Sequence, residues 1–438
     1  MRTVVLGGGE SGTGACLLAK KLGHEVFLSD KGSLSDKYRK VLTDNQIEFE
    51  EGGHSLDRIY NAGLVIKSPG IPDDNPVVEE LRRRGIEVIS EIEFAGRHSS
   101  AKMCCITGSN GKTTTTLLIK HILDTAAGLA GNVGFSLAAQ VAADAHPLYV
   151  IELSSFQLDG MFDFRADVAV LTNITPDHLD RYDFKYENYI NSKFRILQNM
   201  RSEDLFVYGY DSAAVREKVR ELDIVPAQAP FTYLDKKDCA AYMDGNRLTA
   251  RESGRVFSID KNEISIKGRH NIYNAMCAVL ACMRLGVDNE KIAEGLRSFP
   301  QVEHRLETVL VKDGVTYIND SKATNVDSAW YALDSMTAPV VWIAGGKDKG
   351  NDYSVLYELV RKKVKALVCM GLHNEKLIES FSPFCKVVDT DNLEDAVKAA
   401  RNCAEPGDVV LLSPCCASFD LFRSYEHRGE MFKQEVRK

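Results

Sequence analysis

The stretch that decides the fold reads Ile106-Thr107-Gly108-Ser109-Asn110-Gly111-Lys112-Thr113-Thr114. It follows an apolar run at residues 103–107, which predicts a strand, and it precedes a helical pattern beginning at Lys112. In this setting backbone N–H groups wrap phosphates, a lysine neutralises their charge, and the Thr113 hydroxyl suits Mg²⁺. The spacing departs from the common phosphate loop, because Ile106 stands where a first glycine is usual. We predict a nucleoside triphosphate site here.

Short apolar runs alternate with helical patterns on both sides of this loop, which predicts an α/β fold with parallel sheets. Three blocks follow, at residues 1–97, 98–300 and 301–438: a Rossmann-like domain, a P-loop-type ATPase domain and a second Rossmann-like domain. An Asp313-Gly314 pair between two apolar runs predicts a hairpin in the third block. Period-two alternation at residues 255–267 suggests another hairpin, at the edge of the second. The expected strands are residues 3–6, 25–29, 64–67, 86–90, 103–107, 148–153, 167–173, 308–312, 315–319, 340–344, 366–370, 386–388 and 409–412.

Composition narrows the class of protein. The chain has 438 residues, a formal net charge of −8 and no long run of one sign, which argues against broad nucleic-acid binding. The start MRTVVLGGGE carries no secretory signal, and no stretch approaches the about 20 apolar residues of a membrane span. We therefore expect a cytoplasmic protein without a membrane span. Its 11 cysteines include no Cys-x-x-Cys and read as reduced core thiols, with metal or redox roles as the alternative.

A second glycine loop lies near the start of the chain. Residues 7–12 read Gly-Gly-Gly-Glu-Ser-Gly and fit the G-x-G-x-x-G pattern between a strand and a helix. Asp30 ends the next strand, where a carboxylate suits ribose hydroxyls, and Ser68 follows a later strand, where it should meet the same ligand. The pattern predicts binding of a nucleotide diphosphate but not which one. A tight structural turn and an NAD-dependent dehydrogenase are the alternatives.

Polar residues follow two further strands of the middle block. Glu152 ends the apolar run of Val-Ile-Glu-Leu-Ser-Ser-Phe-Gln at residues 150–157, and Asp177 and His178 follow the run at residues 167–173. A lone glutamate at a strand end is usually solvated, and a single histidine is more often structural. Beside a triphosphate site, however, hard oxygen ligands for Mg²⁺ are needed. Lys193 reads from its pattern alone as an exposed helix lysine.

In this order and over essentially the whole chain, these motifs resemble the Mur ligase family, whose members use ATP to join an amino acid to a carboxylate-bearing substrate. The resemblance implies a UDP-substrate-binding first domain, a central ATPase domain and an amino-acid-binding last domain. A dehydrogenase would not need the phosphate loop at residues 106–114, and a regulatory P-loop switch would not need a carboxylate pocket. Sibling ligases for L-alanine, a diamino acid or a dipeptide, and folate-glutamylating enzymes, are the closer rivals.

The resemblance also implies roles for particular residues. Contacts to ATP are implied for Gly108, Ser109, Asn110, Gly111, Lys112, Thr113, Thr114, Asn271, Arg305, Asp320 and Lys322. Catalytic roles are implied for Lys112, His178, Lys193 and Arg305. Metal ligands are implied at Thr113, Glu152, His178 and, if CO₂ carbamylates it, Lys193. Contacts to the UDP-linked substrate are implied for Ser11, Asp30, Lys31, Ser68, Asn132 and His178.

The form of the phosphate loop and the carboxyl-terminal segments resemble those of the D-glutamate-adding members of the family. This resemblance implies D-glutamate as the amino acid, UDP-N-acetylmuramoyl-L-alanine as its acceptor, and an acyl-phosphate intermediate, in peptidoglycan synthesis. A monomer using ATP and Mg²⁺ is expected. Because D-glutamate carries two carboxylates, its pocket should hold cations and hydrogen-bond donors. Lys347-Asp348 departs from the family's usual Asp-Gly, so Lys347 stays an alternative to Lys349. The implied D-glutamate contacts are Thr324, Lys349, Ser418, Phe419 and Tyr425.

Overall fold

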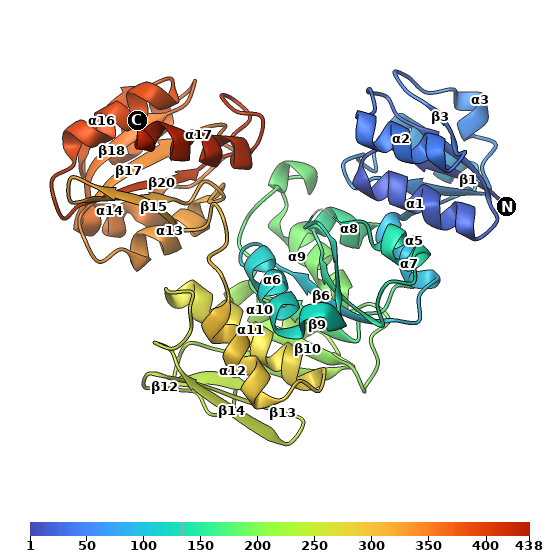
Figure 1. Ribbon diagram of the computed structural model, residues 1–438, viewed down its shortest axis with the longest axis horizontal. Coiled ribbons are helices and arrows are strands. Elements are labelled where there is room, and N and C mark those ends of the chain that lie inside the picture. The colour runs from blue at the N-terminus through green and yellow to red at the C-terminus, as the bar shows by residue number, and fades with distance from the viewer. Residues whose placement is uncertain (134) are drawn as a thin grey trace. The chain divides into compact units, whose positions relative to one another are not determined.

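The computed structural model describes residues 1–133 and 135–438. Within these ranges the strands form three sheets, of five, nine and six strands (Figure 1). The predicted α/β class is thereby confirmed. The chain folds into two compact units, the first comprising Met1–Pro176, Lys185–Glu263 and Tyr273–Ser298, and the second Asp177–Phe184, Ile264–Ile272 and Phe299–Lys438. The division into domains at residues 97 and 300 stays a prediction.

The first sheet is entirely parallel, in the order β3-β2-β1-β4-β5. Its third strand was not predicted, because its three residues, Glu-Phe-Glu, contain no apolar run. The strands are β1 (Arg2–Leu6), β2 (Glu25–Ser29), β3 (Glu48–Glu50), β4 (Leu64–Lys67) and β5 (Glu87–Ser90). The helices are α1 (Glu10–Lys21), α2 (Asp36–Asp44), α3 (Leu56–Ile59), α4 (Pro76–Arg83) and α5 (Glu91–Arg97).

The second sheet has the order β14-β13-β12-β11-β10-β9-β6-β8-β7 and is parallel from β7 to β12. Its strands are β6 (Lys102–Thr107), β7 (Gly128–Gly131), β8 (Leu148–Glu152), β9 (Val168–Leu171), β10 (Leu205–Gly209), β11 (Ala227–Phe231), β12 (Ala241–Asp244), β13 (Arg247–Glu252) and β14 (Arg255–Asp260). The helices are α6 (Lys112–Leu123), α7 (Leu137–Ala142), α8 (Ser155–Asp159), α9 (Tyr186–Phe194), α10 (Ala213–Glu221), α11 (Arg269–Arg284) and α12 (Asn289–Ser298), with 3₁₀ turns η1 (Asp124–Ala126), η2 (Leu179–Arg181) and η3 (Arg195–Leu197).

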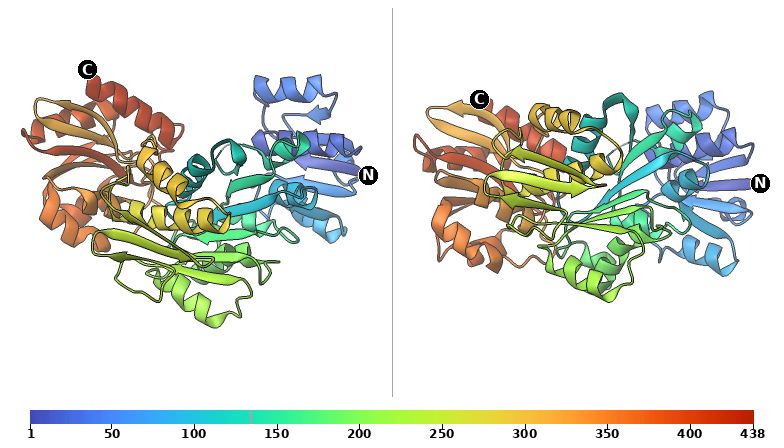
Figure 2. Two further views of the ribbon diagram at one scale, coloured as in Figure 1. Left: turned by 60° about the horizontal axis from the view of Figure 1, so that its bottom comes forward. Right: turned by 90° about the horizontal axis from the view of Figure 1, so that it is seen from below.

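The edge hairpin of this sheet lies earlier in the chain than predicted. The expectation placed it at residues 255–267, but β13 and β14 pair antiparallel, and β14 ends at Asp260 (Figure 2). The turn is made by Ser253 and Gly254, whose φ values of 52° and 72° give the left-handed backbone that tight hairpins require. The prediction was wrong because it overlooked this Ser-Gly turn signal.

The third sheet, in the order β15-β16-β20-β17-β18-β19, is parallel except for the β15–β16 hairpin. Asp313 and Gly314, both with positive φ, form the turn of that hairpin as predicted. The strands are β15 (Glu307–Lys312), β16 (Val315–Asn319), β17 (Val340–Gly345), β18 (Val364–Met370), β19 (Lys386–Thr390) and β20 (Val409–Cys415). The helices are α13 (Val326–Ser335), α14 (Tyr357–Lys363), α15 (Glu375–Phe381), α16 (Leu393–Cys403) and α17 (Tyr425–Arg437), with the 3₁₀ turn η4 (Ser354–Leu356).

Two general expectations can be compared with the structure. All 11 cysteines are free thiols, and most are buried in the cores of the sheets, in line with the predicted reduced state. Over residues 1–133 and 135–438, no helix has both the length and the apolar character to cross a membrane.

Two buried glutamates of α5 hold the first sheet to segments flanking the second. The Glu93 carboxylate, 0% exposed, accepts hydrogen bonds from the backbone N–H groups of Phe162, Asp163 and Phe164 at 2.8–3.0 Å. Glu91 Oε1 accepts from Ser136 Oγ at 2.7 Å and from the N–H group of Ala138 at 2.6 Å. Burial raises the pKa of Glu91 to about 7 despite these donors. The joint between the sheets therefore includes a carboxyl group that resists ionisation.

This raised pKa predicts a pH-dependent stability. A carboxyl group whose pKa is higher in the folded than in the unfolded state lowers the free energy of unfolding as the pH rises through the interval between the two values, here from 4.5 to about 7. Glu91→Gln removes that ionisation. We expect the difference in unfolding free energy, variant minus native, to increase by about 2 kcal/mol between pH 5 and pH 8.

Chemical denaturation at both pH values measures this difference. Glu79→Gln on the exposed face of α4 is the control and should leave the difference independent of pH. A Glu91→Gln difference that did not change between pH 5 and pH 8 would contradict the assignment.

Candidate functional site

The phosphate loop lies between β6 and α6, as the sequence predicts. Gly108 and Gly111 have φ values of 142° and 84°, which L side chains rarely adopt. A Cβ atom on Gly108 would lie 2.0 Å from Thr172 Oγ1, and one on Gly111 would lie 2.4 Å from Asn274 Oδ1. Both glycines are therefore required by backbone conformation and by close packing.

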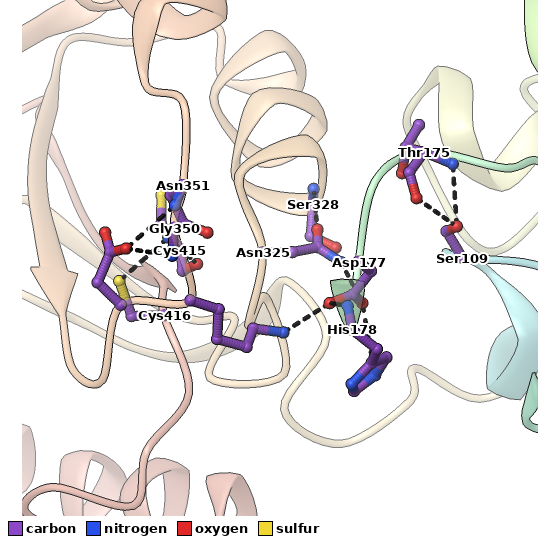
Figure 3. Close-up of polar contacts among 12 residues, drawn as sticks. Ser109, Thr175, Asp177, His178, Asn325, Ser328, Gly350, Asn351, Cys415 and Cys416 are labelled. Carbon is purple, nitrogen blue, oxygen red and sulfur yellow. Dashed lines mark hydrogen bonds and ion pairs between the residues drawn. The ribbon is translucent and has the colours of Figure 1, made fainter. Parts of the chain in front are cut away.

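The loop is braced by the segment that follows β9. Ser109 Oγ donates to the carbonyl of Thr175 and accepts from its N–H group, both at 2.9 Å (Figure 3). The N–H group of Ser109 donates to the carbonyl of Asn173 at 2.9 Å, and that of Asn110 to Asn173 Oδ1 at 3.0 Å. Lys112 Nζ donates to the carbonyls of Gly108 and Ser109 at 2.8 and 2.9 Å. The loop thus holds its lysine over its own backbone, next to where phosphates would lie.

Sequence reasoning gave no role to Asn173 or Asn274, although both lie in motifs that it singled out. Asn173 follows β9, whose end adjoins β6, and Asn274 lies in α11, where it also accepts from Thr115 Oγ1 at 3.2 Å. The sequence did contain a signal for Asn173, because a polar residue directly after a strand that neighbours β6 should reach the phosphate loop. The contact of Asn274 depends on the packing of a helix about 160 residues away in sequence, which no local pattern indicates.

Glu152, Asn132 and Lys193 gather beside the loop. Glu152 ends β8, the other neighbour of β6, and its Oε1 accepts from Asn132 Nδ2 at 2.7 Å. Its Oε2 is buried and has no hydrogen-bond partner. Lys193 is 1% exposed, and its Nζ lies 3.2 Å from Thr107 Oγ1. The exposed position that the pattern of Lys193 predicts is wrong, because α9 turns this side chain into the core beneath the phosphate loop.

The test for a bound metal rests on these atoms. A buried carboxylate oxygen without a donor is unfavourable unless a cation or another group satisfies it. Glu152 Oε2 is such an oxygen, and Thr113 occupies the first turn of α6. The predicted ligands Thr113, Glu152 and Lys193 lie in the first unit and His178 in the second. In the part of the chain described, no three His, Cys, Asp or Glu side chains gather into a metal-binding group. The donor set of the first unit nevertheless fits a hard cation such as Mg²⁺.

The amino-terminal glycine loop brings two of its predicted partners together. Asp30 Oδ2 accepts from the N–H group of Gly8 at 2.5 Å, and Ser68 Oγ lies 3.4 Å from the carbonyl oxygen of Gly7. Ser11 lies in the first turn of α1, and Lys31 is exposed directly after Asp30. The carboxyl ends of β2 and β4 therefore place Asp30 and Ser68 against one loop, the arrangement expected for a nucleotide site, with Ser11 and Lys31 in the adjoining segments.

In the second unit, Arg305 and Asp320 both have buried polar atoms. Arg305 Nε is buried without a hydrogen-bond partner. Burial, reinforced by the charge of Arg305, lowers the pKa of His270 to about 4. Asp320 accepts from Ser413 Oγ at 3.0 Å and from the N–H group of Leu306 at 3.2 Å, and burial raises its pKa to about 7. Asn271 is half-buried, and its Nδ2 donates to the carbonyl of Lys267 at 2.8 Å.

The predicted amino-acid contacts belong to three segments of the second unit. Lys322 Nζ donates to Tyr425 Oη at 2.9 Å, which joins the segment after β16 to the start of α17. Thr324 lies two residues before α13, Ser418 is 2% exposed after β20, and Phe419 is 70% exposed. Lys349 Nζ lies 2.6 Å from Asp177 Oδ1. The next residue, His178, has a left-handed backbone with φ of 53°. Its Nε2 lies 3.7 Å from Asp177 Oδ2.

The two candidate lysines differ in their surroundings. Lys347 is exposed and exchanges backbone hydrogen bonds with Ala417, at 2.8 and 3.2 Å. Lys349 is only 25% exposed at its side chain, and Asp177, its partner, also lies 3.4 Å from Asn325 Nδ2. Asn325 caps α13 by accepting from the N–H group of Ser328 at 2.9 Å. The Lys349 ammonium group is therefore the one associated with the segment that carries Thr324.

The fold and the phosphate loop define an ATP-binding α/β protein, and comparison with known proteins gives its family. Residues 106–282 match the Mur ligase middle domain, residues 304–416 the Mur ligase glutamate ligase domain, and residues 2–77 the MurD N-terminal domain. The chain belongs to the Mur ligase family. This membership confirms the predicted resemblance and the dependence on ATP, and it sets aside the dehydrogenase and the regulatory switch.

Curated relatives match over the full length. A UDP-N-acetylmuramoylalanine–D-glutamate ligase of Bacteroides fragilis is 52% identical over 443 residues, covering 100% of this chain and 99% of that protein. The ligase of the same name from Bacteroides thetaiotaomicron is 51% identical over 441 residues, with the same coverage.

Solved structures share the three-domain fold. A pseudomurein peptide ligase type C from Methanothermus fervidus and a UDP-N-acetylmuramate–alanine ligase from Thermotoga maritima each match with a TM-score of 0.62 at 19% identity. The matches cover 100% of this chain and 100% and 99% of those chains. The predicted fold class is confirmed by these likenesses.

A substitution in the phosphate loop tests the ATP site. Lys112→Ala removes the ammonium group held over the loop, and we expect ADP release to fall by on the order of 10³-fold, because transition-state charge loses a fixed cation. Binding of the UDP-linked substrate, measured by calorimetry, should stay within about twofold. Lys120→Ala, at the other end of α6, is the matched control and should leave turnover unchanged. Wild-type ADP release by the Lys112→Ala variant would disprove the assignment.

Proposed function

We propose that this chain is an ATP-dependent ligase that joins D-glutamate to UDP-N-acetylmuramoyl-L-alanine, with release of ADP and phosphate, in peptidoglycan synthesis. The observation that carries this proposal is the full-length similarity to ligases of that name at 52% and 51% identity. We also propose that the protein acts in the cytoplasm and as a monomer.

The proposed chemistry has two stages. A carboxylate oxygen of the UDP-linked substrate attacks the γ-phosphorus of ATP, ADP leaves, and an acyl phosphate forms. The D-glutamate amine then attacks the acyl carbon, phosphate leaves, and the amine loses its proton, with His178 as a candidate for assisting that loss. Lys112 and Arg305 stabilise charge on the phosphoryl group, and Asn271, Asp320 and Lys322 contact ATP.

Residues near the loop would hold Mg²⁺. Glu152 Oε2 and the Thr113 hydroxyl are suited to it, and His178 is the predicted ligand from the second unit. Bound Mg²⁺ supplies positive charge for the phosphate oxygens. A buried ammonium group beside such a cation is unfavourable, so we propose that Lys193 carries a carbamate, whose negative charge reverses that effect.

The UDP-linked substrate would be bound by residues of the first unit and by His178 of the second. Those of the first unit are Ser11, Asp30, Lys31, Ser68 and Asn132. For D-glutamate, we favour Lys349 over Lys347, since the Lys349 ammonium group pairs with Asp177, which also contacts Asn325 in the segment that carries Thr324. Ser418, Phe419 and Tyr425 complete the proposed amino-acid site.

The test is a phosphate-release assay with ATP, UDP-N-acetylmuramoyl-L-alanine and a panel of amino acids. We expect D-glutamate to give phosphate release at least about 100-fold faster than L-alanine, L-lysine, meso-diaminopimelate or D-alanyl-D-alanine at equal concentration, because a site built for a charged group rejects analogues lacking it. L-glutamate serves as the stereochemical control. Activity with another member of the panel and none with D-glutamate would exclude the proposed substrate while leaving the ligase class intact.

A further inference from the structure

The loop that carries Lys349 is fastened to the neighbouring loop after β20. Strands β17 and β20 pair in parallel, so the loops at their carboxyl ends adjoin. Lys347 and Ala417 form a backbone bridge between the two loops, and Asn351 Nδ2 donates to the carbonyl of Cys415 at 3.2 Å (Figure 3). A Cβ atom on Gly346 would lie 2.3 Å from the carbonyl oxygen of Ala417, which shows how closely the loops approach.

Asp348 ties the Lys349 loop to the core beneath it. Its Oδ1 accepts from the N–H groups of Gly350 at 2.6 Å and Asn351 at 3.0 Å, and its Oδ2 accepts from Tyr353 Oη at 2.7 Å. Burial opposes ionisation of Asp348, but these hydrogen bonds outweigh it and hold the pKa of the carboxyl group below its usual value. The turn is therefore closed around a charged, fully bonded carboxylate.

Tyr353 is the anchor of this arrangement. It is 3% exposed, its ring packs 5.7 Å from that of Phe381, and its Oη also lies 3.3 Å from Cys416 Sγ. Burial raises the pKa of Tyr353, so the phenol stays a neutral donor. One buried hydroxyl thereby reaches both loops, through Asp348 on one side and Cys416 on the other.

Lys349 lies between Asp348 and Gly350, whose N–H group donates to Asp348, and the Lys349 side chain contacts Asp177 outside this turn. This contact is the 2.6 Å ion pair between Lys349 Nζ and Asp177 Oδ1. A lysine side chain has many rotamers. The position of its backbone therefore sets the region that its ammonium group can reach. A fixed turn therefore holds the Lys349 backbone, from which the side chain extends, in one place.

We propose that Asp348 and Tyr353 are positioning residues that set the specificity for an amino acid with a side-chain carboxylate, by presenting Lys349 in one place. This inference rests on the proposed function. Lys349 contacts the carboxylate, whereas Asp348 and Tyr353 act only through Lys349. Asp348, which stands where the sequence departs from the family's usual Asp-Gly, closes this turn from within.

Tyr353→Phe tests the proposal, because it keeps the ring against Phe381 and removes the hydroxyl group. We expect the KM for D-glutamate to rise about tenfold, the loss of one hydrogen bond to a charged group, with kcat and the KM for ATP within twofold. Asp348→Asn is a second variant with the same expected KM change. Tyr357→Phe is the matched control, since that ring also packs on Phe381 and should leave the KM unchanged.

A double-mutant cycle separates positioning from general stability. In a Lys349→Met background, Tyr353→Phe should change the KM for D-glutamate by less than twofold, because the group that it positions is gone. An unchanged KM in both Tyr353→Phe and Asp348→Asn, or a full tenfold effect in the Lys349→Met background, would overturn the proposal. A wild-type chain without D-glutamate-dependent phosphate release would instead overturn the proposed function together with this inference, and the two failures are therefore distinguishable.

Discussion

The parallel pairing of β6 with β8 on one side and β9 on the other is the constraint on which the ATP site depends. Parallel neighbours end at the same edge of the sheet, so the loops after these three strands must converge. Here they deliver the phosphate loop, Glu152 and Asn173 to one place. The chemistry assigned to the chain follows from that convergence and not from any one residue.

The same principle organises the other two sheets. In the first, strands β1, β2 and β4 end around one glycine loop, where Asp30 and Ser68 are found. In the third, β16, β20 and β17 are consecutive neighbours, and the segments after them carry all the proposed amino-acid contacts. One chain thus uses the carboxyl edge of a parallel sheet three times, for three different ligands of the proposed reaction.

How much of this could be predicted from sequence depends on how local each signal is. The phosphate loop could be predicted, because glycines, a lysine and a preceding apolar strand are adjacent in the chain. The burial of Lys193 could not, since its helix pattern does not show that the core lies on its side. Likewise, Asn274 and Tyr353 contact residues far away in sequence, Thr115 and Cys416 respectively. The misplaced edge hairpin arose from following alternation and overlooking the turn at Gly254.

The proposed acyl phosphate is the intermediate that would join ATP use to amide formation, and isotope transfer tests it most directly. UDP-N-acetylmuramoyl-L-alanine labelled with ¹⁸O in both oxygens of its terminal carboxylate is turned over with ATP and D-glutamate, and the released phosphate is analysed by mass spectrometry. Attack of the carboxylate on the γ-phosphorus predicts one ¹⁸O atom in each phosphate and the other in the amide carbonyl. Unlabelled phosphate at full turnover would contradict an acyl-phosphate intermediate.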